Sequence, residues 1–369
     1  MKEEGTREFL VSGFILLLVF SVVATPFLIV EKVYAQEDGS WTTLAPLPMR
    51  QFISNTDVAA YTGTTVLNGK IYYIDLNMTL RYDPETNNWT QLAPLPVYNG
   101  WGTLVACQNK IYVIGDPTQV YDPTTDSWEN RAPLPSIIME MQANVVDNKI
   151  YVISGQPLAG LGIVNPLNTN YVYDPIMDSW SEMAPIPVPV MGYASAVVDN
   201  KIYIISGGHE GGPDYEPINL VQIFDPATNQ WTNGTSIPIA VSSAGACATT
   251  GVSFPKRIYV LGGADNYYYH HSQQGYDFNQ VYDPETDTWT NATALPTPRK
   301  GFNAVVINDE IYAIGGSDRD IYFTVNEKYT PSGYIPEFPS WTILPFVLII
   351  SVFLVVVKRK LYARNPKLR

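Results

Sequence analysis

The sequence predicts an all-β fold, a six-bladed β-propeller, from three observations. An aromatic-Asp-Pro triplet occurs five times, a Trp stands seven residues after each of these aromatic residues, and one orphan Trp precedes the first triplet. The aromatic residues are Tyr82, Tyr121, Tyr173, Phe224 and Tyr282, and their Trp partners are Trp89, Trp128, Trp180, Trp231 and Trp289. Because the interval between triplets varies, a constant unit alternates with loops of different length.

Each unit fits four short strands, as the fourth unit illustrates. A small apolar run at 193–198 is followed by a polar turn and by a second apolar strand at 202–205. A variable loop leads to a third strand at 221–224, and the Asp-Pro sequence then favours a tight turn. The fourth strand carries Trp231 and ends where prolines cannot continue a sheet. Such units indicate four-stranded antiparallel blades.

The sixth unit, at 302–331, lacks a fourth strand. Seven residues after Tyr329 stands Pro336 instead of a Trp. The segment 40–48, SWTTLAPLP, repeats the fourth-strand sequence NWTQLAPLP at 88–96 but has no unit before it. We therefore predict that Trp41 lies in the missing strand, so that the N-terminal strand closes the ring by pairing into the last blade.

The units resemble kelch repeats, whose hallmarks are a Gly-Gly pair after the second strand and a Tyr and a Trp at fixed separation. Gly207-Gly208, Gly262-Gly263 and Gly315-Gly316 match this pattern, Gly155-Gln156 and Gly115-Asp116 match it in part, and Asp75-Leu76 does not. The resemblance covers roughly residues 40–330 and implies a kelch-type propeller over 36–335.

The two ends of the chain predict export and a membrane tether. Residues 9–30 are almost continuously apolar and precede a small-x-small pattern ending at Ala35, which indicates a signal peptide over 1–35, or alternatively an uncleaved N-terminal anchor. Residues 342–357 fit a transmembrane helix, and 358–369 form a basic tail. The positive-inside rule places that tail in the cytoplasm and the propeller at the cell surface.

The stalk at 336–341 contains Pro336-Glu337-Phe338. This motif, followed by an apolar helix and a basic cluster, resembles the C-terminal sorting signals that archaeosortases process. The resemblance implies a processing enzyme of that type as a partner, removal of the helix and an archaeal source. A plain single-pass anchor is the alternative.

The net charge excludes one class of ligand, and the positions of the two cysteines exclude a disulfide. The chain between residues 36 and 357 has 13 basic and 31 acidic residues, a net charge of −18, which excludes nucleic acid as a ligand. Cys107 and Cys247 fall in first strands of blades on opposite sides of the ring, so we expect two buried thiols rather than a disulfide.

Binding residues are expected where the repeat breaks. The repeated residues (Trp41, Tyr82, Trp89, Tyr121, Trp128, Tyr173, Trp180, Phe224, Trp231, Tyr282, Trp289, Tyr329) have structural roles. Strand alternation places the loops between second and third strands on the same face as the loops between blades. Aromatic inserts there suit an extracellular glycan or an envelope protein. The candidate ligand-binding residues are Arg50, Trp101, His209, Tyr215, Tyr267, Tyr268, Tyr269, His270, His271, Tyr276 and Arg299.

An enzyme is the alternative function. Some kelch propellers are copper oxidases, and others are exported sugar mutarotases that act on substrates such as sialic acid; no catalytic residue can be assigned here. We expect no cofactor and no metal, because the adjacent His270 and His271 would point in opposite directions on an extended segment.

Four sequons, at Asn77, Asn88, Asn233 and Asn291, fit a glycosylated surface protein.

Overall fold

The computed structural model describes residues 39–48, 61–75, 78–97, 102–157, 165–209, 216–265, 274–319 and 321–332. The chain divides into two units, Met1–Glu37 and Asp38–Arg369, of which the first lies outside the described residues. The expected signal peptide, Pro-Glu-Phe motif, transmembrane helix and basic tail also lie outside them. Within the described residues, none of the helices has the length and apolarity needed to span a bilayer.

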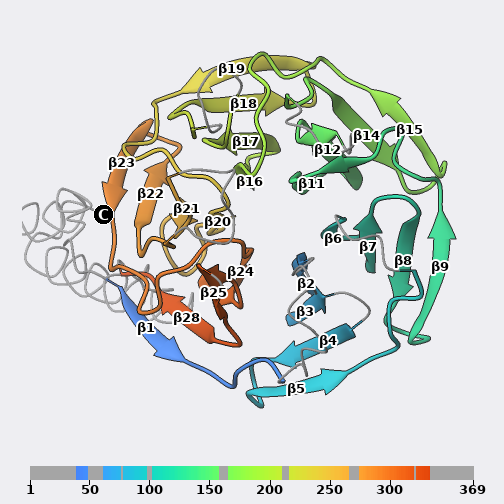
Figure 1. Cartoon of the computed structure of the whole chain (residues 1–369), viewed down its shortest axis with the longest axis horizontal. Coiled ribbons are helices and arrows are strands. Elements are labelled where there is room, and N and C mark those ends of the chain that lie inside the picture. The colour runs from blue at the N-terminus through green and yellow to red at the C-terminus, as the bar shows by residue number, and fades with distance from the viewer. Residues whose placement is uncertain are drawn as a thin grey trace, which may run out of the picture. The chain divides into compact units, whose positions relative to one another are not determined.

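Six four-stranded antiparallel sheets form a ring, which confirms the predicted propeller (Figure 1). The first strand of each blade lies nearest the centre and the fourth runs along the circumference. First strands of neighbouring blades contact one another in cyclic order. In blades 1 to 3 the strands are β2 (Tyr61–Leu67), β3 (Lys70–Asp75), β4 (Met78–Asp83), β5 (Asn88–Gln91); β6 (Thr103–Cys107), β7 (Lys110–Ile114), β8 (Thr118–Asp122), β9 (Ser127–Arg131); and β11 (Ala143–Val146), β12 (Lys149–Ile153), β14 (Asn170–Asp174), β15 (Ser179–Glu182). In blades 4 to 6 they are β16 (Ala194–Val198), β17 (Lys201–Ile205), β18 (Val221–Asp225), β19 (Gln230–Gly234); β20 (Gly245–Ala248), β21 (Ile258–Leu261), β22 (Asn279–Asp283), β23 (Thr288–Asn291); and β24 (Ala304–Ile307), β25 (Glu310–Ile314), β28 (Asn326–Thr330), β1 (Ser40–Thr43).

The core lies between blades rather than within a single sheet. Each second strand is covered on both faces by neighbouring blades, so its sequence is continuously apolar, as in β17. An Ile at the equivalent position of the second strand is fully buried in all six blades: Ile71, Ile111, Ile150, Ile202, Ile258 and Ile311. Cys107 and Cys247 are buried in first strands and are not bonded to each other, as expected. Burial raises the pKa of the Cys107 thiol to about 11, which keeps it protonated at neutral pH.

The ring closes as the orphan Trp predicts. β1 pairs antiparallel with β28, with Trp41 directly opposite Tyr329 and their ring centroids 5.0 Å apart. The indole Nε1 of Trp41 donates to the carbonyl oxygen of Thr293 in blade 5 at 3.0 Å. Leu47, which follows the strand, is buried, and its backbone nitrogen donates to the oxygen of Thr324 at 2.8 Å.

One hydrogen-bonded arrangement recurs at the blade boundaries, and we call it the joint. At each of the six boundaries the Trp Nε1 of one blade donates to a backbone carbonyl at the end of the preceding blade. The pairs, at 2.8–3.1 Å, are Trp41–Thr293, Trp89–Ala45, Trp128–Ala93, Trp180–Ala132, Trp231–Ala184 and Trp289–Thr235. We call the residue that supplies the carbonyl the anchor of its joint.

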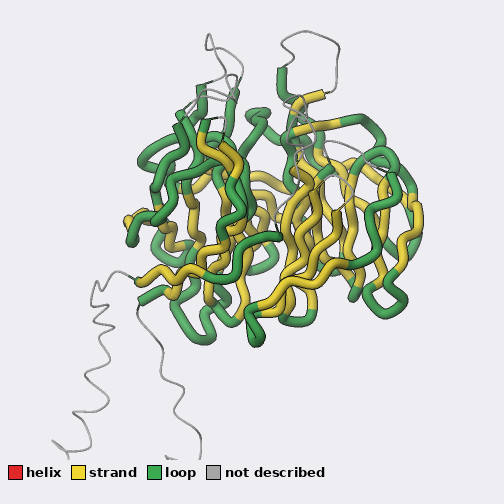
Figure 2. The backbone as a smooth tube through the Cα atoms, turned by 60° about the horizontal axis from the view of Figure 1, so that its bottom comes forward, coloured by secondary structure: helices red, strands yellow, loops and turns green. Residues whose placement is uncertain are grey.

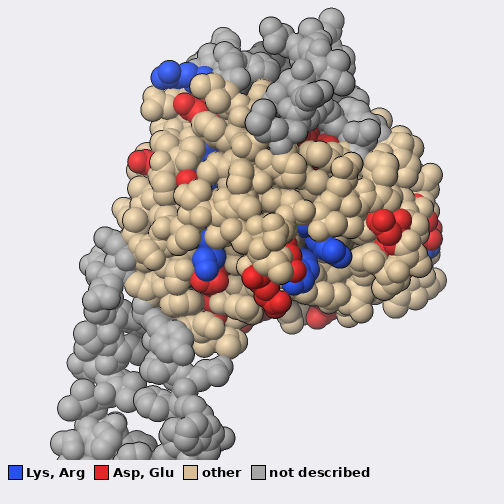
Figure 3. Space-filling model, turned by 90° about the horizontal axis from the view of Figure 1, so that it is seen from below, with Lys and Arg blue, Asp and Glu red and all other residues tan. Residues whose placement is uncertain are grey.

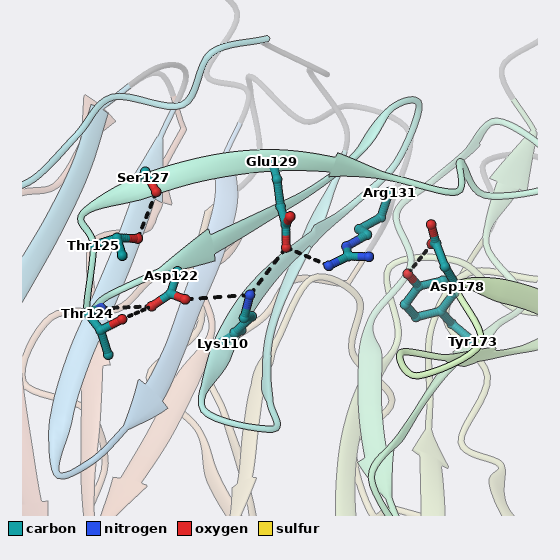
Figure 4. Close-up of polar contacts among 9 residues, drawn as sticks. All are labelled: Lys110, Asp122, Thr124, Thr125, Ser127, Glu129, Arg131, Tyr173 and Asp178. Atoms are coloured by element: carbon teal, nitrogen blue, oxygen red, sulfur yellow. Dashed lines mark hydrogen bonds and ion pairs between the residues drawn. The ribbon is translucent and has the colours of Figure 1, made fainter.

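At five of the joints an Asn or Asp binds the anchor a second time. Its Oδ1 accepts from the backbone nitrogen of the same anchor at 2.7–2.9 Å. These residues are Asn87, Asp126, Asp178, Asn229 and Asp287, all with a positive φ that Asn and Asp tolerate. Where the third strand carries a Tyr, its hydroxyl donates to the same Oδ1, as Tyr173 does to Asp178 (Figure 4).

The Asp-Pro turns add repeated ion pairs. Asp122 accepts from the backbone and hydroxyl of Thr124 and lies 3.5 Å from Lys110, which also contacts Glu129 (Figure 4). Equivalent pairs join Lys70 to Asp83, Lys149 to Asp174 and Arg257 to Asp283. Basic and acidic side chains accordingly lie beside one another in an edge-on view (Figure 3).

Removing the closing Trp should weaken the whole ring. We expect Trp41→Ala to lower the free energy of unfolding by about 2–4 kcal/mol, because both the packing against Tyr329 and the bond to Thr293 are lost. Trp41→Phe should cost about 1 kcal/mol and the exposed control Thr42→Ala less than about 0.5 kcal/mol. Denaturant unfolding measures these differences. Deletion of residues 36–48 exposes the β28 edge, and an unchanged melting temperature after that deletion would show that β1 does not close the ring.

The joints also predict an acid-sensitive stability. Hydrogen bonds from Tyr121, Tyr173 and Tyr282 are the main cause that lowers the pKa of Asp126, Asp178 and Asp287, respectively. A lowered folded-state pKa adds stability above the unfolded value of about 3.9, and this is lost as the pH falls through the folded value.

The matched change is the triple variant Asp126→Asn, Asp178→Asn, Asp287→Asn, since Asn87 and Asn229 already fill this position in blades 1 and 4. Urea unfolding should show the wild type more stable than the variant at pH 7 and the gap closing towards pH 3. A gap that is independent of pH would contradict the assignment.

Candidate functional site

Two sets of loops meet on one face of the ring, which we call the loop face. They are the loops between second and third strands and the connections that enter each blade, and they gather along the upper edge of the molecule in Figure 2. In blade 3 they pair as β10 (Ile138–Met139) with β13 (Gln156–Pro157). Single bridges do the same in blades 4, 5 and 6: Met191 with Gly208, Ser242 with Ala264, and Lys300 with Ser317. The predicted convergence of the two loop sets is therefore confirmed.

A chain of backbone hydrogen bonds links the connections of successive blades just before their first strands. Gly192 donates to Glu140 at 3.0 Å, Ser243 to Gly192 at 2.7 Å, and Gly301 to Ser243 at 2.8 Å. All four residues have φ between 54° and 64°, the left-handed region that favours glycine. Glu140 and Ser243 adopt this conformation although they are not glycines. The backbone hydrogen bonds therefore fix the conformation of the connections, and a glycine is not required.

The Gly-Gly pairs lie where the two loop sets touch. A Cβ on Gly262 would collide with the carbonyl oxygen of Arg299. Gly263, with φ of 91°, donates to that same oxygen at 3.0 Å. The close approach of two backbones explains why this repeat position requires glycine.

Of the eleven candidate ligand-binding residues, the structure describes three, His209, Tyr276 and Arg299. The other eight, Arg50, Trp101, Tyr215, Tyr267, Tyr268, Tyr269, His270 and His271, lie outside the described residues. His209 is half-buried, and its Nδ1 lies 2.9 Å from the carbonyl oxygen of Pro189, which orients the ring. Tyr276 is half-buried and its ring centroid lies 4.5 Å from that of Phe278. Burial is the main cause that raises the pKa of Tyr276, so its hydroxyl stays protonated and can donate.

Arg299 does not lie on the surface, in contrast to its predicted role. Its side chain is fully buried in blade 6, where its guanidinium forms a 2.6 Å ion pair with Glu327 and donates to the carbonyl of Ala313. Burial lowers the pKa of Arg299, and the adjacent Glu327 carboxylate opposes that shift. A ligand on the loop face would not reach this group, so Arg299 is a structural residue of blade 6.

The repeat explains what Arg299 and Glu327 replace. Gln119, Gln222 and Gln280 occupy the third-strand position of Glu327, and each binds the backbone of the connection that enters its own blade. Glu327 instead accepts from the hydroxyl of Thr297 in that connection. Val190 and Val241 stand where blade 6 has Arg299. A buried ion pair thus substitutes in blade 6 for an amide and an apolar side chain.

The described residues contain no group of three or more His, Cys, Asp or Glu side chains that could hold a metal ion. The exposed charged residues that the structure describes on the loop face are Asp116, Glu216, Asp265, Asp277 and Arg319. Four of these five are acidic.

The internal repeat supplies a control for the buried pair. We expect Glu327→Gln to destabilise the protein by about 3–5 kcal/mol, because Arg299 is left buried without its counter-charge. The double variant Arg299→Val, Glu327→Gln reproduces the residues of blades 4 and 5 and should recover most of that loss. Denaturant unfolding of both variants measures the coupling. A double variant no more stable than Glu327→Gln alone would show that blade 6 cannot use the arrangement of its neighbours.

Comparison with known proteins agrees with this architecture. A family model described as the KLHDC2/KLHL20/DRC7 Kelch-repeats domain matches residues 116–316, and a Kelch motif model matches 298–345. Similar proteins include Kelch-like protein 35 of Mus musculus (33% identical over 146 residues, 40% of this chain and 22% of that protein) and Kelch-like protein terF of Aspergillus terreus (30% over 189 residues, 46% and 38%).

The chain thus spans less than two-fifths of the length of these curated relatives. The solved structure of YjhT is similar with a TM-score of 0.61 and 17% identity, covering 73% of this chain and 95% of that one, which supports the fold alone. Since the first family model matches more than half of its length, the chain belongs to the kelch-repeat family.

Proposed function

We propose that this chain is an extracytoplasmic, membrane-tethered kelch-repeat binding module that recognises a glycan or an envelope protein through its loop face. The observation that carries the proposal is the uneven distribution of loop length. The turns between third and fourth strands are four residues long in each of the first five blades. The loops between second and third strands are 2 and 3 residues long in blades 1 and 2 but 16, 15, 17 and 11 in blades 3 to 6.

This distribution separates scaffold from binding surface. The repeated Trp, Tyr and Asp residues are engaged in joints and turns, which hold the blades together. Variation is concentrated on the loop face, where it changes the surface without disturbing a joint.

The chemistry of the described loop ends suits sugar or protein recognition. Tyr276 and Phe278 form an aromatic pair beside the connection that carries Arg299, because the backbone of Arg299 donates to Tyr276 at 3.0 Å. Aromatic faces stack on the apolar faces of sugar rings and anchor protein interfaces, and a phenol adds a directional hydrogen bond.

The tether rests on the sequence of the ends. The apolar segments at 9–30 and 342–357 and the basic tail at 358–369 support an outward-facing propeller attached to the membrane. The Pro336-Glu337-Phe338 motif supports processing by an archaeosortase-type enzyme, which would replace the helix by another anchor.

Binding can be tested with the full-length protein in detergent on a glycan array and on blots of envelope proteins. We expect His209→Ala, Tyr276→Ala together to weaken binding at least tenfold, because both side chains lie on the loop face. Met177→Ala, an exposed residue in a turn on the opposite face, should leave binding unchanged. Equal binding by all three proteins would contradict the site, and catalysed anomer exchange of a free sugar, followed by NMR, would favour the enzyme alternative.

A further inference from the structure

The anchor of the joint differs between blades. Four of the six anchors are alanines: Ala45, Ala93, Ala132 and Ala184. The anchors at the ends of blades 4 and 5 are Thr235 and Thr293. The four alanine joints form through the backbone carbonyl and nitrogen of the anchor alone, so a threonine is not needed to form a joint. The threonine hydroxyls add contacts of their own, from Thr235 to Asp287 and from Thr293 to the carbonyl of Gly39.

Each of these two threonines stands two residues after an asparagine. Asn233-Gly-Thr235 and Asn291-Ala-Thr293 are therefore sequons, created where the anchor departs from alanine. The equivalent of the asparagine is Thr43, Gln91 and Glu182 in blades 6, 1 and 3. Blade 2 has Asn130 but keeps Ala132 as its anchor. Asparagine and threonine thus occur together at the same place in two adjacent blades.

The structure presents both asparagines to solvent. Asn233 in β19 and Asn291 in β23 are exposed on fourth strands, which form the circumference of the ring (Figure 1). Neither side-chain amide has a hydrogen-bond partner among the described residues. Asn88 is also exposed, but its Nδ2 donates to the carbonyl of Thr86 at 2.8 Å, and Asn77 lies outside the described residues.

We propose that Asn233 and Asn291 carry N-linked glycans. The amide Nδ2 forms a bond to the anomeric carbon of a sugar, the bond from that carbon to the diphosphate of a lipid-linked oligosaccharide breaks, the lipid diphosphate leaves, and the amide loses one proton. This inference rests on the proposed extracytoplasmic location, because lipid-linked donors of this class are used on that side of the membrane.

The positions of the two sites determine when the glycans are transferred relative to ring closure, and which surface of the propeller they cover. The hydroxyl of Thr293 donates to the carbonyl of Gly39 at 2.7 Å once β1 is in place, so transfer to Asn291 is expected before the ring closes. Both glycans would extend from the circumference, beside the joints, and leave the loop face free. They would also cover fourth strands, whose outer edges have no neighbouring strand.

The test is glycopeptide mass spectrometry of the full-length protein from its own host, combined with labelling of intact cells by a membrane-impermeant amine reagent. We expect glycan on Asn233 and on Asn291. Thr235→Ala and Thr293→Ala should each remove one glycan while restoring the alanine anchor that four joints use. Ala132→Thr should add one glycan, on Asn130, which is exposed on β9 in the equivalent position. Near-wild-type melting temperatures would show that the variants fold.

The outcomes separate the inference from the proposed location. Unmodified Asn233 and Asn291 in a protein that is labelled from outside would overturn the glycans and leave the tethered module standing. An unmodified protein that is protected from the label would overturn both. Glycan that persists in Thr235→Ala and Thr293→Ala would mean that these two sequons are not what is recognised.

Discussion

The structure depends on the joint, in which a Trp indole, joined in five of the six cases by an Asn or Asp side chain, holds the backbone of a single residue in the preceding blade. Each of its hydrogen bonds contributes only about 1 kcal/mol net. Their effect is larger because the blades form a closed cycle: first strands touch in order around the ring, and the last joint is made by Trp41. In an open array a terminal unit can separate alone, whereas in a ring each blade is held from two sides.

This constraint explains why blade 6 differs from the others. Its fourth strand comes from the start of the chain, so no turn of two or four residues fixes the register between β28 and β1. The entering connection of the same blade is held by Arg299 and Glu327, which form a buried ion pair. Buried ion pairs contribute little net stability, but they can impose one arrangement over others. We infer that the ion pair fixes the position of blade 6, the one blade whose third and fourth strands are not joined by a short turn.

The sequence was sufficient for the fold because its strongest signal is local. Tyr82 and Trp89 lie opposite each other across the four-residue turn 84–87, and the same geometry recurs in the other blades. A Tyr and a Trp seven residues apart therefore indicate a hairpin directly. Trp41 has no such Tyr before it, which indicates a strand that pairs with a distant part of the chain. Arg299 was misplaced because its partner is 28 residues away in sequence. The sequence did contain a signal for this pair, since Glu327 occupies the third-strand position that is a buried glutamine in three other blades. The binding residues could not be predicted in the same way, because loops that do not repeat offer no internal comparison.

The charge of the described surface narrows the ligand class further. Eight of the twelve basic residues that the structure describes form ion pairs with acids, and Lys70, Lys149 and Arg257 do so at the Asp-Pro turns. On the loop face, the only exposed cation among the described residues is Arg319, against four exposed acids. A carboxylated sugar such as sialic acid requires a cationic or strongly donating site to replace its hydration. Neutral sugar rings, or a basic surface on a partner protein, meet this face with a smaller desolvation cost. The described part of the loop face is therefore better suited to a neutral or basic ligand surface than to an acidic one.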